Sequence, residues 1–344
     1  MVNNDSTSPG KDVTDQPVSD QGLGLLEGTS FYAMLEQRLG RNLLAVRLEQ
    51  QLHHAADAYG GRGLLRLHPE NMEPLMSVLD LALRALGLAD RGRRNAADYR
   101  LERIEHTLPG LPEAFDGFTI LHLSDIHADR LTEDAGRLEA LLGTSPCDLA
   151  VFTGDYRFDT HGDYTRCLTR MASLVASLRC AHGILGILGN HDFIEIVPLL
   201  ERLGIRMLLN ESWTLERAGQ RLCVAGVDDP HYYGGDDLGR ALVGKRDADT
   251  VVLLAHSPEL YRQASAAGVH LYLCGHTHGG QICLPGGFAP IVNAACPRRL
   301  TRGVWRYQGM RGYTARGTGA SGLPVRFWCP PEVTLHTLRC LPDR

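Results

Sequence analysis

The sequence predicts an α/β fold with an N-terminal helical extension. From about residue 118 onward, short apolar runs that are too short for helices alternate with stretches of helical periodicity. Between residues 29 and 87 the periodicity is helical only, and the turn-rich segment 108–112 separates the two regimes. An apolar fraction of 44% in 344 residues is sufficient for one large domain with a smaller appendage.

The N-terminal part is expected to contain a disordered tail followed by helices. Residues 1–22 are polar and acidic, so they cannot bury enough apolar surface to offset the entropy of ordering. Apolar residues at helical spacing predict helices near 31–39, 43–52 and 72–86. We expect these helices to pack on one another or on the main domain. The arginines that follow the third helix make contact with an anionic membrane surface the alternative.

Strands and helices alternate in the rest of the chain. The predicted strands are residues 118–123, 148–153, 183–188, 221–227, 250–255 and 269–274. The predicted helices between them are residues 131–142, 164–178 and 198–203. Residues 304–338 alternate apolar and polar side chains and are expected to be β-rich. The predicted division is a tail (1–22), a helical region (23–110) and an α/β domain (111–344).

Polar residues of metal-binding types follow five of these strands. The carboxyl ends of strands are where open α/β sheets place their sites. Taken singly, each residue has an ordinary explanation as a helix cap, a turn or a polar loop. Their joint occurrence favours a common site, and the candidate ligands are Asp125, His127, Asp155, Asn190, His256, His276 and His278.

This ligand set predicts two metal ions. Carboxylate, imidazole and amide oxygen suit Mn, Fe or Zn better than an all-oxygen calcium cage. Seven ligands exceed the needs of one ion that still binds water, so two divalent ions sharing a ligand are expected. Asp155 follows Gly154 and is sterically free to lie between them.

Composition narrows the partners and the compartment. A net charge of −5 without a basic stripe provides no nucleic-acid-binding platform. Nine scattered cysteines without a C-x-x-C pair indicate reduced thiols. With no signal peptide and no apolar run near ~18 residues, a cytoplasmic protein is expected, with peripheral contact at the inner face of the membrane as the alternative. The oligomeric state is left open.

The ordered motifs resemble those of the calcineurin-like metallophosphoesterases. The motifs are Asp125-x-His127, Gly154-Asp155, Gly189-Asn190-His191-Asp192, His256 and Gly275-His276-x-His278. The resemblance covers residues 115–344 and implies an αββα sandwich of two packed mixed sheets flanked by helices. Segments 255–258, 279–281 and 319–327 resemble a bacterial subgroup that includes membrane-associated phosphodiesterases and a UDP-2,3-diacylglucosamine pyrophosphatase branch.

The resemblance also implies roles for single residues. Asp125, His127 and His278 would hold one metal, and Asn190, His256 and His276 the other, with Asp155 bridging. His191 would act near the leaving group and Asp192 would orient it. The implied reaction is hydrolysis of a phosphodiester or pyrophosphate bond, in a small, nucleotide or lipid-linked substrate, by in-line attack of a metal-bridging hydroxide. A metal-stabilised, non-catalytic interaction module is the alternative.

Several further residues have a functional and an ordinary interpretation. Arg316, in a glycine-flanked loop, is expected to bind substrate, and Arg326 could grip a second phosphate. Asp228 and Asp229 could support a metal-bound histidine or simply form a turn before Pro230. A final group could line a substrate pocket or form a loop cluster: His231, Tyr232 and Tyr233.

Overall fold

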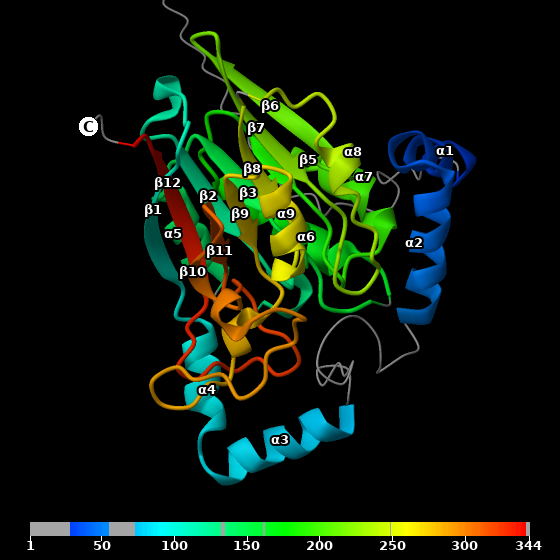
Figure 1. The fold of residues 1–344 in the computed structure, drawn as a ribbon. Coiled ribbons are helices and arrows are strands. Elements are labelled where there is room, and N and C mark those ends of the chain that lie inside the picture. The colour runs from blue at the N-terminus through cyan, green and yellow to red at the C-terminus, as the bar shows by residue number, and fades with distance from the viewer. Residues whose placement is uncertain (1–27, 55–72, 132–134, 161, 248, 342–344) are drawn as a thin grey trace, which may run out of the picture.

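A computed structural model shows two stacked sheets with helices on their outer faces (Figure 1). It describes residues 28–54, 73–131, 135–160, 162–247 and 249–341. The predicted disordered tail, residues 1–22, lies outside these ranges. Among the helices in the described ranges, none combines the length and the apolar character needed to cross a bilayer.

Each sheet has six strands and mixes parallel with antiparallel pairs. The first has the order β1 (Arg100–Thr107), β12 (Glu332–Arg339), β2 (Thr119–Leu123), β3 (Leu149–Phe152), β4 (Ile184–Gly186) and β5 (Ile205–Met207). The second has the order β10 (Gly303–Tyr307), β11 (Met310–Thr314), β9 (Leu271–Cys274), β8 (Thr250–Leu254), β7 (Gln220–Gly226) and β6 (Glu211–Arg217). In the first sheet only β12 and β2 pair antiparallel. In the second, the outer pairs β6–β7 and β10–β11 do so.

Alternation along the strands produces four layers. In β2, Ile120 faces the second sheet and packs near Val252, whereas Leu121 faces the helices. The outer face of the first sheet is covered by α5 (Ala135–Gly143), α6 (Thr165–Ser177) and α7 (Val197–Arg202). The outer face of the second is covered by α8 (Leu238–Ala241) and α9 (Tyr261–Ala266). The predicted αββα sandwich is therefore confirmed.

The helical region joins this sandwich at two places. Its helices are α1 (Gly28–Leu39), α2 (Arg41–His54), α3 (Glu73–Ala85) and α4 (Ala89–Ala96). Phe31 and Leu35 of α1 and Leu44 of α2 are buried in the core beneath the first sheet. Leu83 of α3 instead packs with Val325 in a separate small cluster. The helices thus pack on the main domain as expected, while the division into domains stays a prediction.

One strand lies where only helix was expected. Residues 100–107, inside the predicted helical region, form β1 and pair in parallel with β12 over all eight residues. The sequence Arg-Leu-Glu-Arg-Ile-Glu-His-Thr is rich in charge because β1 is an edge strand, and charged side chains discourage further pairing there. The helical prediction is wrong for these residues.

A row of buried histidines runs across β1, β12 and β2 of the first sheet. The Nδ1 of His336 in β12 lies 3.0 Å from Nε2 of His106 in β1. Its Nε2 lies 3.3 Å from Nδ1 of His122 in β2. His122 Nε2 is in turn 2.8 Å from the Thr153 hydroxyl. All three imidazoles are fully buried, and those of His122 and His336 lie beside the ring of Tyr313. This polar row ends one residue before Gly154, at the edge of the site.

Candidate metal centre and active site

The seven predicted ligands converge at the carboxyl ends of β2, β3, β4, β8 and β9. Two groups have ligand atoms within 4.8 Å of one another: Asp125, His127 and His278, and Asp125, Asp155 and His256. The groups share Asp125. Asn190 Oδ1 joins the second group, 3.0 Å from His256 Nε2 and 2.9 Å from His276 Nδ1. The structure therefore brings all seven together, and all are buried.

Five of these ligands have a left-handed backbone. The φ angles are 50° at Asp125, 45° at His127, 57° at Asp155, 70° at His276 and 47° at His278. Residues with a Cβ rarely adopt such angles, and strained positions of this kind cluster at functional sites. The tight turns at the strand ends therefore aim successive side chains at one point.

Two glycines let the ligand loops touch. A Cβ on Gly275 would overlap the Ser124 hydroxyl and the Asp125 carboxylate, and one on Gly189 would overlap Asp155 Oδ1. The amide of His276 can consequently donate to both carboxylate oxygens of Asp125, at 3.0 Å each. The glycines predicted beside the motifs thus serve close approach of backbone to ligand.

Backbone carbonyls set the tautomers of two ligand histidines. His127 Nδ1 lies 3.0 Å from the Arg157 carbonyl oxygen, and His256 Nδ1 lies 2.7 Å from that of Thr153. Because a carbonyl only accepts, both Nδ1 atoms carry a proton, so Nε2 is the nitrogen of each ring that could bind a metal once it is deprotonated.

The Nε2 of His127 faces His278 Nε2 at 3.2 Å. His278 donates in this pair, because Arg326 Nη2 can only donate to His278 Nδ1, at 3.4 Å. A metal ion would replace the proton on His278 Nε2, and both Nε2 atoms could then bind it.

The charge of the cluster also calls for a cation. Burial raises the pKa of Asp125 to about 6. Burial alone would lower the pKa of His256, yet the charges of Asp155 and Asp125 raise it to about 10. The pKa of Asp155 is held well below its usual value despite burial, chiefly by His256 and His191. Buried carboxylates need compensating positive charge, and divalent ions at these ligands would supply it.

Comparison with known proteins identifies the family. The family model for calcineurin-like phosphoesterases matches residues 118–280. The chain is 33% identical over 253 residues to the metallophosphoesterase YkuE of Bacillus subtilis (strain 168), covering 70% of this chain and 86% of YkuE. This chain belongs to the calcineurin-like phosphoesterase family. It is also similar to YkoQ of the same organism, 26% identical over 260 residues, with coverage of 72% and 93%.

A vertebrate relative extends the comparison. The Danio rerio transmembrane protein with metallophosphoesterase domain is 30% identical over 283 residues, covering 76% of this chain and 62% of that protein. Membership makes the chain a hydrolase of phosphoester bonds. Calcineurin-like phosphoesterases use divalent metals, and the two ligand groups above are possible sites for them.

His191 of this metallophosphoesterase lies at the cavity, beside the metal ligands. Its Nδ1 is 2.8 Å from the Phe158 carbonyl oxygen. Because a carbonyl oxygen accepts, Nδ1 carries a proton, and Nε2 is the ring nitrogen through which a proton can be transferred. Its ring stacks on Phe158 and meets His127 edge-on. Its amide donates to Asp155 Oδ1 at 2.9 Å. The side chain is thus oriented by the Phe158 carbonyl.

Asp192 binds backbone amides. Its carboxylate accepts from the N–H groups of Asp155 at 2.7 Å, Tyr156 at 2.9 Å and Gly189 at 2.9 Å. Asp192 therefore ties together the two loops that carry Asp155 and Asn190. This geometry favours a role in loop positioning over the expected role of orienting the His191 ring.

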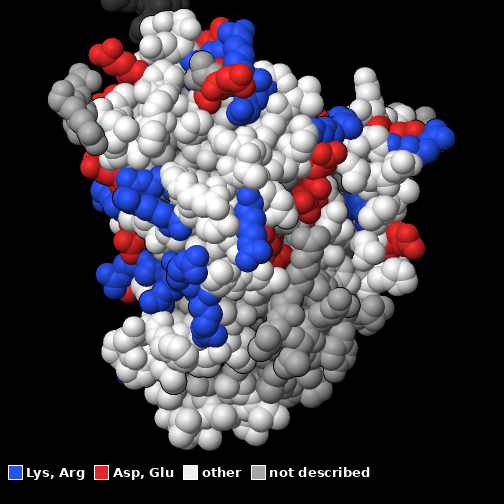
Figure 2. Space-filling view, viewed as in Figure 1, with Lys and Arg blue, Asp and Glu red and all other residues white. Residues whose placement is uncertain are grey.

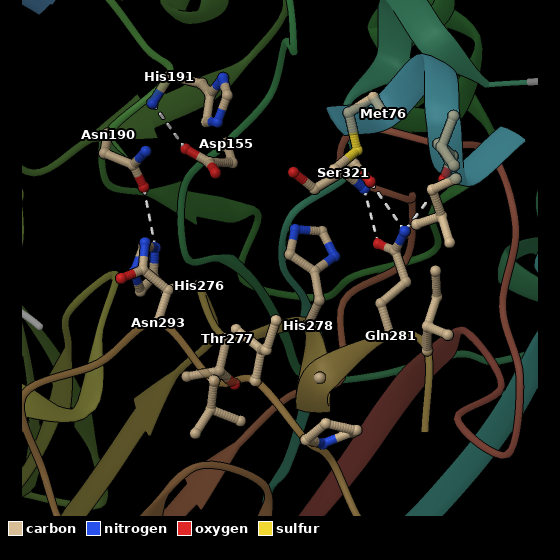
Figure 3. A pocket seen from close by; sticks show the side chains of 17 residues that line it. Met76, Asp155, Asn190, His191, His276, Thr277, His278, Gln281, Asn293 and Ser321 are labelled. Carbon is tan, nitrogen blue, oxygen red and sulfur yellow. Dashed lines mark hydrogen bonds between the residues drawn. The ribbon is translucent and has the colours of Figure 1, made fainter. Parts of the chain in front are cut away.

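A cavity of about 370 Å³ opens over the ligands. Figure 3 shows Asp155, Asn190, His191, His276 and His278 on one side of it and Met76 and Gln281 on the other. Much of the remaining lining is apolar and comes from Met76, Leu79, Ile282, Pro290, Ile291, Val292 and Leu323. Met76 and Leu79 come from α3, and their place beside the site was not predicted. The only sequence signal was that α3 is apolar on more faces than one packing contact needs.

The two arginines expected to bind substrate are engaged elsewhere. Arg316 pairs with Glu332 and with Glu102, so the prediction that it grips a phosphate is disfavoured by its ion pairs. Arg326 is fully buried and donates to backbone carbonyls, including those of Gly317 and Cys329. Neither lines the cavity.

The residues after β7 form a turn behind the site. Asp229 accepts from the amides of His231, Tyr232 and Tyr233, so the turn interpretation describes it well. His231 packs against His276, with ring centroids 4.0 Å apart. This turn supports the ligands from behind and does not line the cavity.

Proposed function

We propose that this chain is a dinuclear-metal-dependent phosphodiesterase or pyrophosphatase. The observation that carries the proposal is the position of the Asp155 carboxylate, whose Oδ2 lies 3.9 Å from His127 Nε2 of one proposed ligand set and 3.4 Å from His256 Nε2 of the other. A carboxylate within reach of both sets is what two neighbouring ions would need. One ion would be held by Asp125, His127 and His278 and the other by Asn190, His256 and His276, with Asp155 contributing to both.

Bound divalent ions would supply an activated water and neutralise phosphate charge, and the native ions would be Mn, Fe or Zn. The protein groups supply orientation and a proton. His191, fixed through Nδ1 by Phe158, would give a proton from Nε2 to the departing oxygen or stabilise its charge. Asp192 would hold the Asp155 and Asn190 loops at their working separation.

The cavity wall supports a substrate with an apolar part. Apolar side chains of α3 and of the 282–292 segment line the same cavity as Asp155, Asn190, His276 and His278. A phosphate bound at the ligands would place a substituent against this wall. We therefore favour a lipid-linked or base-bearing phosphoester over a simple sugar phosphate. This fits the resemblance to the subgroup with the UDP-2,3-diacylglucosamine branch.

For the location of the protein, we propose contact with a membrane surface through the apolar residues around the cavity. Val78, Leu81 and Leu86 in and after α3 are two-thirds exposed or more, and Phe288 and Ile291 of the facing loop are also exposed. In Figure 2 the described atoms at the lower end, where Figure 1 places α3, carry few charges. An apolar rim around a cavity suits an enzyme that takes its substrate from a bilayer surface.

The decisive experiment is hydrolysis of bis(p-nitrophenyl) phosphate with added Mn²⁺. We expect wild-type turnover, and roughly 100-fold or greater loss of kcat in Asp155→Asn and in His191→Ala. The two differ in mechanism: Asp155→Asn is expected to weaken Mn²⁺ binding, whereas His191→Ala should retain it. Bound Mn²⁺ without turnover of any nucleotide, lipid-linked or simple phosphoester would favour the interaction-module alternative.

A further inference from the structure

A fully buried arginine outside the family match reaches the segment that carries Asn190 and His191. Arg47 of α2 has 1% of its surface exposed. Its Nη2 donates to the Asp192 carbonyl oxygen at 2.5 Å, and its Nε lies 3.5 Å from Asp228 Oδ2. Its guanidinium carbon lies 3.4 Å from the centre of the Tyr233 ring. A helix remote in sequence thus holds one backbone carbonyl of the ligand segment.

A second side chain of α2, that of Gln51, binds the same segment at Ile194 and Glu195. Gln51 lies one helical turn after Arg47, on the same face of the helix. Its Oε1 accepts from the Ile194 amide at 2.8 Å, while its Nε2 donates to Glu195 Oε2 at 3.1 Å. Arg47 and Gln51 together fix the backbone from Asp192 to Ile194.

Tyr233 completes the support. Its hydroxyl donates to the Asn190 carbonyl oxygen at 3.0 Å, and its ring lies against the guanidinium of Arg47. The carbonyls of Asn190 and Asp192, on either side of His191, are therefore both bound by one packed unit. Moving this unit would move His191 relative to Asp155, whose carboxylate accepts from the His191 amide.

The buried face of α2 combines Leu44 with two polar residues, a choice that stability alone does not favour. Arg47 and Gln51 are buried, whereas the neighbouring Val46 and Leu52 are 43% and 79% exposed. Burying a guanidinium carries a desolvation cost that an apolar residue would avoid. A demand for directed hydrogen bonds at the ligand segment explains this choice.

We propose that α2 is part of the active site: Arg47 and Gln51, with Tyr233, are positioning residues that hold Asn190 and His191 in their working geometry. The proposal rests on the proposed phosphoesterase function. It assigns a role to a helix that precedes the matched residues 118–280. Arg47 and Gln51 act through the backbone of the ligand segment and do not line the cavity.

The test uses the full-length chain, four variants of the supporting residues and one control variant. Arg47→Met, Gln51→Leu and Tyr233→Phe each remove hydrogen bonds to the segment, and Arg47→Lys keeps a donor and the charge. Arg38→Gln is the matched control, because Arg38 of α1 binds Glu201, Glu211 and the Met207 carbonyl oxygen, away from residues 189–194. Thermal unfolding fixes a temperature at which every variant is folded.

We expect Arg47→Met and Gln51→Leu to lower kcat by roughly 10- to 100-fold, with KM for bis(p-nitrophenyl) phosphate changed far less. Tyr233→Phe should lose less, and Arg47→Lys should recover most of the loss. Arg38→Gln should keep wild-type kcat even where its melting temperature falls equally. Wild-type kcat in the α2 variants, or an equal loss in the control, would overturn the proposal.

Calorimetric titration with Mn²⁺ separates this proposal from the proposed function. Asn190 lies on the supported segment, so Arg47→Met should weaken Mn²⁺ binding by roughly 10-fold or more, as loss of supporting contacts does at metal sites. This readout needs no turnover. An inactive wild type with this loss of affinity would reject the phosphoesterase while supporting the positioning role. Unchanged affinity in Arg47→Met, Gln51→Leu and Tyr233→Phe would reject the positioning role.

Discussion

Strain is concentrated on single residues at the ends of β2, β3 and β9. Left-handed angles at Asp125, His127, Asp155, His276 and His278 each cost on the order of 1 kcal/mol. Such angles persist only where neighbours leave no alternative. Here the neighbours are the closely packed loops themselves, whose contact depends on glycine. The ligand geometry is therefore rigid before any ion arrives.

Gly275→Ala tests this directly. The added methyl group would collide with the Asp125 carboxylate and the Ser124 hydroxyl, so this candidate ligand must move. We expect roughly 100-fold loss of kcat together with weaker Mn²⁺ binding, since displacement of about 1 Å has such effects. Gly136→Ala in α5 is the control, because its methyl group would meet nothing within 4 Å. Normal activity in Gly275→Ala would contradict the close approach.

At the scale of elements, α3 lines the cavity on one face and exposes apolar side chains on another. Met76 and Leu79 line the cavity, while Val78 and Leu81 face outward. Leu81→Glu combined with Leu86→Glu is expected to abolish co-sedimentation with vesicles containing anionic lipid, because charge on the apolar rim opposes insertion. Hydrolysis of a water-soluble phosphoester should stay unchanged.

The control for α3 places the same charge elsewhere. Val243 follows α8 and is 73% exposed, so Val243→Glu alters an exposed apolar side chain far from the cavity. It should leave vesicle binding intact. Absence of vesicle binding by the wild type, or equal loss in Val243→Glu, would reject membrane contact through α3.

The helical extension also shows where sequence reasoning stops. Apolar spacing correctly predicted that α1 packs by Phe31 and Leu35. The same reasoning would also bury Val46 and Leu52 of α2, but Arg47 and Gln51 are buried beside Leu44 instead, because the ligand segment offers them hydrogen-bond partners. Partners 140 or more positions away in the chain cannot be seen in local periodicity. The role of α2 therefore emerged only from tertiary contacts.

For the whole molecule, the clustering of the candidate ligands was predictable and the sheet edges were not. Each ligand follows a buried strand, and buried strands are short apolar runs that stand out in sequence. β5 has three residues and β1 alternates charged with apolar ones, so neither contrasts with a loop. Edge strands lack the burial on which pattern reasoning depends.

The buried histidine row predicts a pH dependence of folding. Burial lowers the pKa of His106 to about 4 and of His122 to about 3, and it lowers that of His336 well below 6.5. Below pH 6.5 the unfolded chain therefore binds protons at these three histidines that the folded chain does not bind. The part of the free energy of unfolding that depends on these histidines being neutral is fully present above pH 6.5. It is lost as the pH falls toward 4, by about 1.4 kcal/mol per pH unit for each histidine.

Urea unfolding at pH 7, 6 and 5, with a chelator to remove metal, measures this slope. His336→Gln keeps hydrogen-bonding capacity without a titrating group, so its free energy of unfolding should fall less steeply with acid. The difference between the two slopes should approach the value for one histidine, about 1.4 kcal/mol per pH unit. A slope identical to that of the wild type would show that the row does not control acid stability.

The position of β12 has a consequence for biosynthesis. The last strand of the described chain lies between β1 and β2, two of the earliest, so the edge of β2 stays open until residues 332–339 have been synthesised. Asp125 and His127 directly follow that unfinished strand. The first sheet, and with it the arrangement of the candidate metal ligands, can therefore be completed only when residues up to about 339 have left the ribosome.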